Sequence, residues 1–162
     1  MRAGVLAGTL GGALMAVVVF RLTLAGTPES WQPLRAMAAA LLGEDALAGG
    51  AFAMLVALAI HVVTSSAWGI AFAWLAGTRP RGVASVGLGV AASLVIMVIM
   101  TFGVLPTVDP ILYEQAMLGL PSWIVAHVTY GFGLAIAPAI RRSTARSDEA
   151  TTRALPAAVQ AP

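Results

Sequence analysis

Four long apolar stretches, separated by short polar loops, make up most of this chain. They cover about residues 3–25, 50–76, 83–105 and 122–140. A helix needs about 20 apolar residues to cross a hydrocarbon layer of roughly 30 Å, and each stretch is close to that length. The pattern predicts an all-α membrane protein with four transmembrane helices.

Two shorter segments between these stretches are also predicted to be helical. Residues 29–42 place apolar side chains at helical spacing with Pro33 in the first turn, and residues 110–118 open at Pro110. Each segment is followed by a glycine, and proline at the start with glycine after the end is typical of helices. We expect both helices to lie in the outer membrane interface, and Asp109 to cap the second. Aromatic residues that would anchor them there are Trp31, Tyr113 and Trp123.

The charged residues predict the orientation of the chain. Basic residues precede the first stretch, occupy the second loop and follow the fourth stretch, whereas the first and third loops are mainly acidic. The positive-inside rule therefore places both termini and the second loop in the cytoplasm. The residues concerned are Arg2, Arg79, Arg81, Arg141, Arg142 and Arg146 on one side and Glu29, Glu44, Asp45, Asp109 and Glu114 on the other.

Composition narrows the class of protein further. The 162 residues are enough for one domain, and 59% of them are hydrophobic while 10% are charged, against about 25% charged in soluble domains. Cysteine is absent, which excludes disulfides and thiolate metal sites, and the net charge of +2 does not favour a nucleic-acid partner. All nine basic residues are arginine, and alanine and glycine are abundant. This usage suggests a bacterial genome rich in G and C, and hence a bacterial inner membrane.

The two ends of the chain each raise a separate question. The first stretch could be a signal peptide, but its 18 apolar residues from Ala3 to Phe20 exceed the usual 7–15 of such a region. We therefore expect a retained helix. Residues 143–162 are rich in Ala, Thr, Arg and Pro, and we expect a disordered cytoplasmic tail.

The two halves of the chain show the same order of elements. Each half is predicted as membrane helix, interfacial helix and membrane helix, and each second membrane helix contains one histidine, His61 or His127. Small or polar residues then follow each histidine in steps of four, on one helix face. Both halves cross the membrane in the same direction, so the pattern predicts a parallel repeat. These rows are Ser65, Gly69 and Ala73, and Gly131, Ala135 and Ala139.

His61 and His127 are the two ionisable side chains predicted to lie deepest in the membrane. Such residues are costly there and are functional candidates by default. Three roles remain open: a hydrogen bond to a neighbouring helix, axial ligation of a haem b or a metal, and handling of protons or solutes. Arg21 is expected to snorkel to the headgroups or to pair with an acidic loop residue. Other polar candidates within the membrane are Ser65, Thr129 and Tyr130.

Small residues recur at spacing four in the first and third stretches, at Gly4, Gly8 and Gly12 and at Gly87 and Ala91. Such faces let helices approach closely in lipid, either within one chain or between two subunits. Serine-hydrolase, zinc-protease and phosphate-loop motifs are all missing from the sequence. The sequence therefore favours a non-catalytic membrane component that acts by helix packing, with itself or with a partner complex. A haem-binding electron-transfer subunit and a small transporter are the alternatives.

The segment His127-Val-Thr-Tyr130-Gly131 resembles the His-x-x-Tyr-Gly segment in the last helix of small four-helix bacterial inner-membrane proteins of the YagU-like kind. The resemblance covers one helix and the general layout. It implies a shared bundle, and it brings no reaction with it.

Overall fold

The computed structural model describes residues 1–24 and 31–154, and this part of the chain is helical without strands. Four of its segments are long and apolar enough to cross a membrane, which confirms the predicted all-α fold with four helices able to span a membrane. Two of the spans are single helices, α1 and α3, and two are interrupted. The segments are α1 (Arg2–Leu24), α3 (Ala51–Ala76), Val83–Val108, which begins with α4 (Val83–Val98), and Leu120–Ser147, which begins with α7 (Leu120–Leu134).

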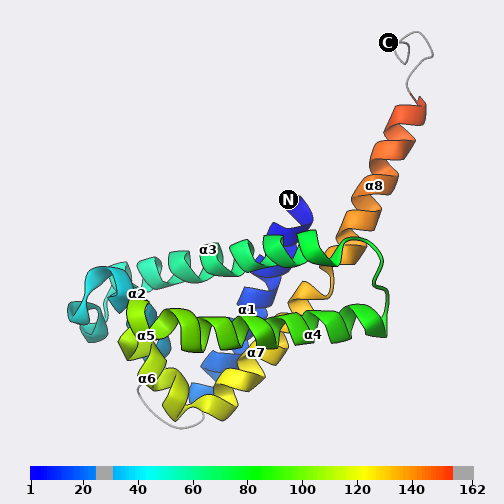
Figure 1. Cartoon of the computed structure of the whole chain (residues 1–162). Helices are drawn as coiled ribbons and strands as arrows, with labels where there is room; N and C mark the ends of the chain where they lie inside the picture. The colour runs from blue at the N-terminus through cyan, green and yellow to red at the C-terminus, as the bar shows by residue number, and fades with distance from the viewer. Residues whose placement is uncertain (25–30, 155–162) are drawn as a thin grey trace.

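Short helices lie together at one end of the bundle, opposite α8 (Ala137–Ala154) and the α3–α4 loop (Figure 1). Both predicted loop helices are present, although residues 29 and 30 lie outside the described residues. Asp109 caps the second one, since its Oδ1 accepts the Leu112 N–H at 3.0 Å. Their position in the membrane interface stays a prediction. The elements at this end are α2 (Gln32–Leu42), η1 (Glu44–Ala48), α5 (Leu105–Val108) and α6 (Pro110–Leu118).

Small side chains face inward and large ones face outward along these helices. In α1, for example, Ala7 and Gly8 are buried while Leu6 and Leu10 are exposed. This arrangement suits a lipid environment, where the outer surface is covered by hydrocarbon and helices associate by close backbone packing. The small-residue face of the first stretch, at Gly4, Gly8 and Gly12, therefore lies in the interior of the bundle, whereas Gly87 and Ala91 are exposed.

At three helix–helix contacts, glycines allow the two backbones to approach so closely that a side chain would not fit. A Cβ added at Gly8 in α1 would lie 3.0 Å from Gly69 Cα in α3, and one at Gly133 in α7 would lie 2.5 Å from the Gly11 nitrogen in α1. Gly89 brings α4 against α7 in the same way. By contrast, α3 and α4 contact each other very little, although they run side by side in Figure 1.

The α1–α3 and α4–α7 contacts use corresponding positions. Gly8 faces the Ser65 carbonyl in the first pair, and Gly89 faces the Gly131 carbonyl in the second. Ser65 and Gly131 each lie four residues after a histidine, in the two rows that the sequence singles out. The second row is shorter than predicted, because α7 ends at Leu134, before Ala135, and Ala139 is exposed.

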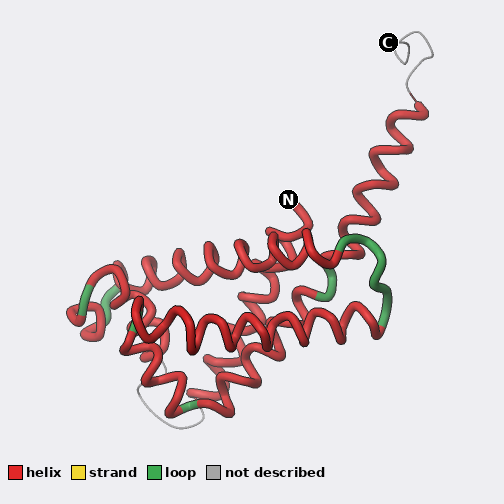
Figure 2. Tube along the Cα trace, viewed as in Figure 1, coloured by secondary structure: helices red, strands yellow, loops and turns green. Residues whose placement is uncertain are grey.

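The fourth spanning helix is not continuous over residues 122–140, as the sequence suggests. It consists of α7 and α8, with a turn at Ala135 and Ile136 (Figure 2). Pro138 explains the break, because it has no N–H for the carbonyl four residues earlier and its ring crowds that carbonyl. The third spanning helix is modified for the same reason. A π-helical segment, Ile99–Val104, lies just before Pro106, and the Leu105 N–H bonds to the carbonyl of Met100.

Residues 143–154 were expected to be disordered, but α8 continues as a helix through Ala154. Alanine and arginine are good helix formers, and the start of the segment is held to the bundle. Arg142 Nη1 donates to the carbonyls of Thr78 and Pro80, at 2.9 Å each, in the α3–α4 loop. Residues 155–162, the rest of the predicted tail, lie outside the described residues.

Candidate functional site: a cavity within the membrane span

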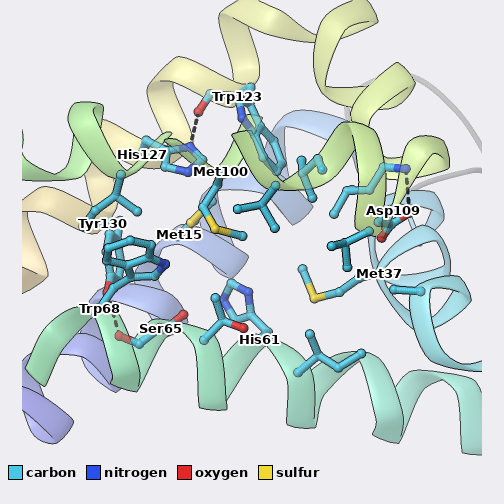
Figure 3. Close-up of a pocket in the computed structure, with 18 residues that line it drawn as sticks. Met15, Met37, His61, Ser65, Trp68, Met100, Asp109, Trp123, His127 and Tyr130 are labelled. Carbon is cyan, nitrogen blue, oxygen red and sulfur yellow. Dashed lines mark hydrogen bonds between the residues drawn. The ribbon is translucent and has the colours of Figure 1, made fainter. Parts of the chain in front are cut away.

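A cavity of about 280 Å³ lies among the spanning helices, toward the end that carries α2 and α6. Its walls are mostly apolar, with a few polar groups from different helices (Figure 3). Helices α1 and α7 close its back, α2 and α6 close one end, and packed side chains of Phe72 and Ile96 close the other. The remaining side lies between α3 and α4, which scarcely touch. On this side the cavity is therefore bordered by two helices that are not closely packed against each other.

Both histidines line this cavity, His61 from α3 and His127 from α7. They come from the two halves of the chain, and α2 and α6 cover the same cavity with Met37 and Leu112. The structure thus brings together the two deep ionisable residues that the sequence could not place relative to each other.

His61 joins α3 to α1. Its Nε2 lies 2.9 Å from the carbonyl oxygen of Gly12, which can only accept a hydrogen bond. Nε2 therefore carries the hydrogen, and Gly12 has no side chain to block the approach. This bond to a neighbouring helix is one of the roles that the sequence left open.

His127 is bound differently from His61. Its Nδ1 lies 2.9 Å from the Trp123 carbonyl in its own helix, so the imidazole does not bond to a neighbouring helix. The link to α4 is made by the backbone instead, since Ser93 Oγ donates to the His127 carbonyl at 2.5 Å. The imidazole is buried at 5% exposure, and its orientation follows from the bond to Trp123.

Two further hydrogen bonds fix the walls of the cavity. Tyr130 Oη donates to the Ser65 carbonyl at 2.6 Å and joins α7 to α3. Trp123 Nε1 donates to Thr101 Oγ1 at 2.9 Å and joins α7 to the π-helical segment. The Trp123 ring lies against the cavity and His127, and its expected anchoring in the outer interface stays a prediction.

Asp109 lies where the cavity meets α6, just after the third spanning segment. The carboxyl group is buried at 4% exposure. Burial raises its pKa above the usual 3.8, and the hydrogen bond from the Leu112 N–H offsets part of this effect. A charge held in this position is therefore a source of pH-dependent stability.

Asp109→Asn should remove that pH dependence. A raised pKa means that the folded state binds its proton more tightly, so wild-type stability falls as pH rises from about 4 through the folded pKa. The asparagine of the variant would keep an oxygen for the cap and carry no charge. Unfolding free energy measured in detergent between pH about 4 and about 7 checks this. Parallel profiles for the two proteins would contradict it.

Of the six polar residues singled out in the sequence, four line the cavity: His61, Ser65, His127 and Tyr130. Thr129 does not, since its hydroxyl donates to the Val125 carbonyl in its own helix. Arg21 is exposed in the last turn of α1, away from the cavity. Its snorkelling or pairing stays a prediction, and its possible partner Glu29 lies outside the described residues.

Sequence reasoning missed several lining residues. Trp68 lies seven residues after His61 and Trp123 four before His127, so helical spacing from the histidines could have found both. Met15 and Met100 reach the cavity from α1 and the π-helical segment, and nothing in their local sequence indicates it.

The haem and transport hypotheses stay predictions. Axial ligation by both histidines is compatible with their shared cavity, but ligation through Nε2 of His61 would break its bond to Gly12. A transport path would have to continue beyond the cavity, past the packed side chains of Phe72 and Leu134. No family model, curated protein or solved structure matches this chain.

Proposed function

We propose that this chain is a non-catalytic protein of a bacterial inner membrane that binds a lipid-soluble molecule in the cavity between α3 and α4. Both termini would face the cytoplasm. This orientation is supported by the clustering of arginines from α8 and the α3–α4 loop at one end of the bundle, while Asp109 and Glu114 lie at the other. The cavity would then lie in the outer half of the membrane, with α2 and α6 as its cover.

The observation that carries the proposal is a mostly apolar cavity beside two loosely packed helices, α3 and α4, between which it would open sideways to lipid. Ligand pockets are commonly apolar hollows of about 300–1,000 Å³ with a few placed polar groups, and a volume of about 280 Å³ is near the lower limit of that range. Closing α3 onto α4 would bury this space, yet among the described spanning helices the extensive contacts are α1–α3, α1–α7 and α4–α7. A molecule dissolved in the bilayer can reach the opening without crossing water.

The predicted repeat gives a reason for the opening. Under a parallel repeat, α1 corresponds to α4 and α3 to α7, and the matching contacts of Gly8 and Gly89 support this assignment. The tight α1–α7 contact would then correspond to the loose α4–α3 contact. Gly11 and Gly133 permit the close α1–α7 contact. Between α3 and α4, in contrast, bulky residues such as Trp68 and Met100 line the cavity. The cavity is therefore where the two halves differ.

The resemblance to YagU-like proteins is consistent with such a bundle. In the shared segment, Tyr130 bonds to the Ser65 carbonyl and Gly131 contacts the α4 backbone. Both residues therefore act in packing between helices. The proposal that this chain and YagU-like proteins share a bundle rests on these two contacts.

Filling the cavity should abolish saturable binding of a lipid-soluble probe. In lipid nanodiscs, bromododecane should quench the fluorescence of Trp68 saturably when that residue is the only tryptophan retained. Thr64→Phe should remove the saturable component, because Thr64 lines the cavity and a phenyl ring would occupy it. The measurement is Trp68 emission as a function of the amount of probe in the membrane.

Val63→Phe is the matched control, since Val63 is the neighbouring residue on α3 and is 68% exposed, away from the cavity. It should leave the saturable quenching intact. A second control retains only Trp74, which is 78% exposed and should be quenched in proportion to the probe. If Trp68 and Trp74 respond alike in the wild-type background, the proposed binding site is wrong.

Self-association through α4 is a second candidate, and one observation favours it. The Gly87–Ala91 pair is the small-residue face that the chain leaves unfilled, since a Cβ at Gly87 would meet nothing within 4 Å and Ala91 is exposed. A second copy could pack there by backbone approach. Gly87→Leu should then convert a dimer to a monomer in mild detergent, measured by light scattering, while Val86→Leu, at an exposed position on a different face of α4, should not. A wild-type protein that is already monomeric would contradict this candidate.

A further inference from the structure

We infer that the cavity binds a lipid-soluble aromatic alcohol, a phenol or hydroquinone with a hydrocarbon chain, whose hydroxyl group donates a hydrogen bond to His127. This inference rests on the proposed binding function and names the class of ligand. It follows from the tautomers of the two histidines, the other polar groups of the wall, and the shape of the cavity.

Each imidazole uses one ring nitrogen in a hydrogen bond, and this bond determines whether the second nitrogen is a donor or an acceptor. A backbone carbonyl cannot donate, so the bonds to Gly12 and Trp123 place the ring hydrogen on Nε2 of His61 and on Nδ1 of His127. In a neutral imidazole the other nitrogen is then an acceptor. His127 Nε2 and His61 Nδ1 are therefore acceptors on rings that line the cavity. A molecule that binds to them must carry a donor.

The wall also contains donors that no hydrogen bond occupies within the described residues. Trp68 has an indole N–H and Thr64 a hydroxyl, and both residues line the cavity. By contrast, the Tyr130 hydroxyl and the Trp123 N–H are committed to Ser65 and Thr101. A hydroxyl group satisfies both kinds of site, because it donates through its hydrogen and accepts through its oxygen. A carbonyl or ether oxygen could only accept.

The apolar wall favours a ring next to that hydroxyl. Met15 and Met100 place thioether groups in the middle of the cavity, with Trp68 and Trp123 on either side (Figure 3). An aromatic ring of the ligand would make favourable contacts with both the thioether sulfurs and the indole rings. The volume of about 280 Å³ suits a ring rather than a long chain. A chain attached to the ring would leave through the gap between α3 and α4 into the lipid.

The test uses the fact that the sequence contains only two histidines. Protein labelled with ¹⁵N-histidine is placed in phosphatidylcholine nanodiscs and titrated with para-heptylphenol and with its methyl ether, para-heptylanisole. The spectrum should first show Nε2–H for His61 and Nδ1–H for His127. The phenol should then shift His127 Nε2 saturably, and the ether should bind about tenfold more weakly, as expected for one lost hydrogen bond.

His127→Phe should lower the affinity for the phenol to that for the ether, whereas His127→Gln retains an acceptor and should keep part of the difference. In these variants the resonances of His61 report binding. Thr129→Val is the control on the same helix, because Thr129 does not line the cavity. The comparison of phenol and ether in the wild-type protein does not depend on any variant folding.

Two results would overturn the inference. The first would leave the proposed binding function intact, and the second would exclude it as well. Equal affinity for the phenol and the ether, or the opposite tautomer at His127, would exclude the hydroxyl interaction and leave the cavity as a binding site. The absence of a saturable shift with either probe, together with unsaturable quenching of Trp68 by bromododecane, would exclude the proposed function as well.

Discussion

Gly133→Ala is expected to disrupt the bundle, although it adds only one methyl group. The new Cβ would lie 2.5 Å from the Gly11 backbone nitrogen and closer still to the Gly11 Cα, so no side-chain rotation can relieve the overlap. Helices α1 and α7 would have to separate. Overpacking typically costs about 1–3 kcal/mol, and a clash between two backbones should reach or exceed the upper value. Unfolding by increasing amounts of SDS, followed by circular dichroism or tryptophan fluorescence, measures the loss.

Gly87→Ala is the matched control for this prediction. Gly87 is also a helical glycine in a spanning segment, but a Cβ there would meet nothing within 4 Å. Alanine is a better helix former than glycine by about 1 kcal/mol, so this variant should be as stable as wild type or more stable. Equal stability of the two variants would show that the α1–α7 contact does not depend on the missing side chain.

Leu134→Ala is the second change with a large expected effect, a loss of about 3 kcal/mol in unfolding free energy. Leu134 is fully buried at 0% exposure in the core formed with Phe72, Ile96 and Tyr130. Truncation leaves a space that the neighbouring backbones, already in contact through glycines, cannot collapse to fill. The lost dispersion contacts matter in lipid as they do in water. The same SDS titration gives the value.

Leu55→Ala provides the comparison, because Leu55 is 64% exposed on α3 and would face lipid. It should change the unfolding free energy by less than about 0.5 kcal/mol. If Leu55→Ala were as damaging as Leu134→Ala, large side chains on the outer surface would be part of an interface with another subunit. That outcome would favour the self-association candidate over a monomeric bundle.

Most of the fold could be predicted from local patterns in the sequence. The four spans follow from runs of apolar residues, and the cap at Asp109 and the ends of α6 follow from Pro110 and Gly119. The breaks were harder to predict. Pro106 and Pro138 indicate a disturbance, but a proline does not say whether a helix widens into a π turn or separates into two helices. Neighbouring packing makes that choice.

The candidate site was only partly predictable for a related reason. His61 and His127 stand out because ionisable groups are rare at this depth, and helical spacing would have added Trp68 and Trp123. The partners of the histidines could not be predicted, since His61 bonds to a carbonyl and every residue has one. For the same reason, the sequence could not give the tautomers on which the proposed hydroxyl recognition depends.

The sequence by itself determined the number of spanning helices, the small-residue faces and the distribution of charge, because each of these depends on residue type along one segment. Only the tertiary structure decided which faces meet. It paired α1 with α3 and α7 through glycines, left α3 apart from α4, and so created a cavity between them. The physical reason is that helix association in lipid depends on the shapes of both partners, and one segment of sequence specifies only one of the two surfaces.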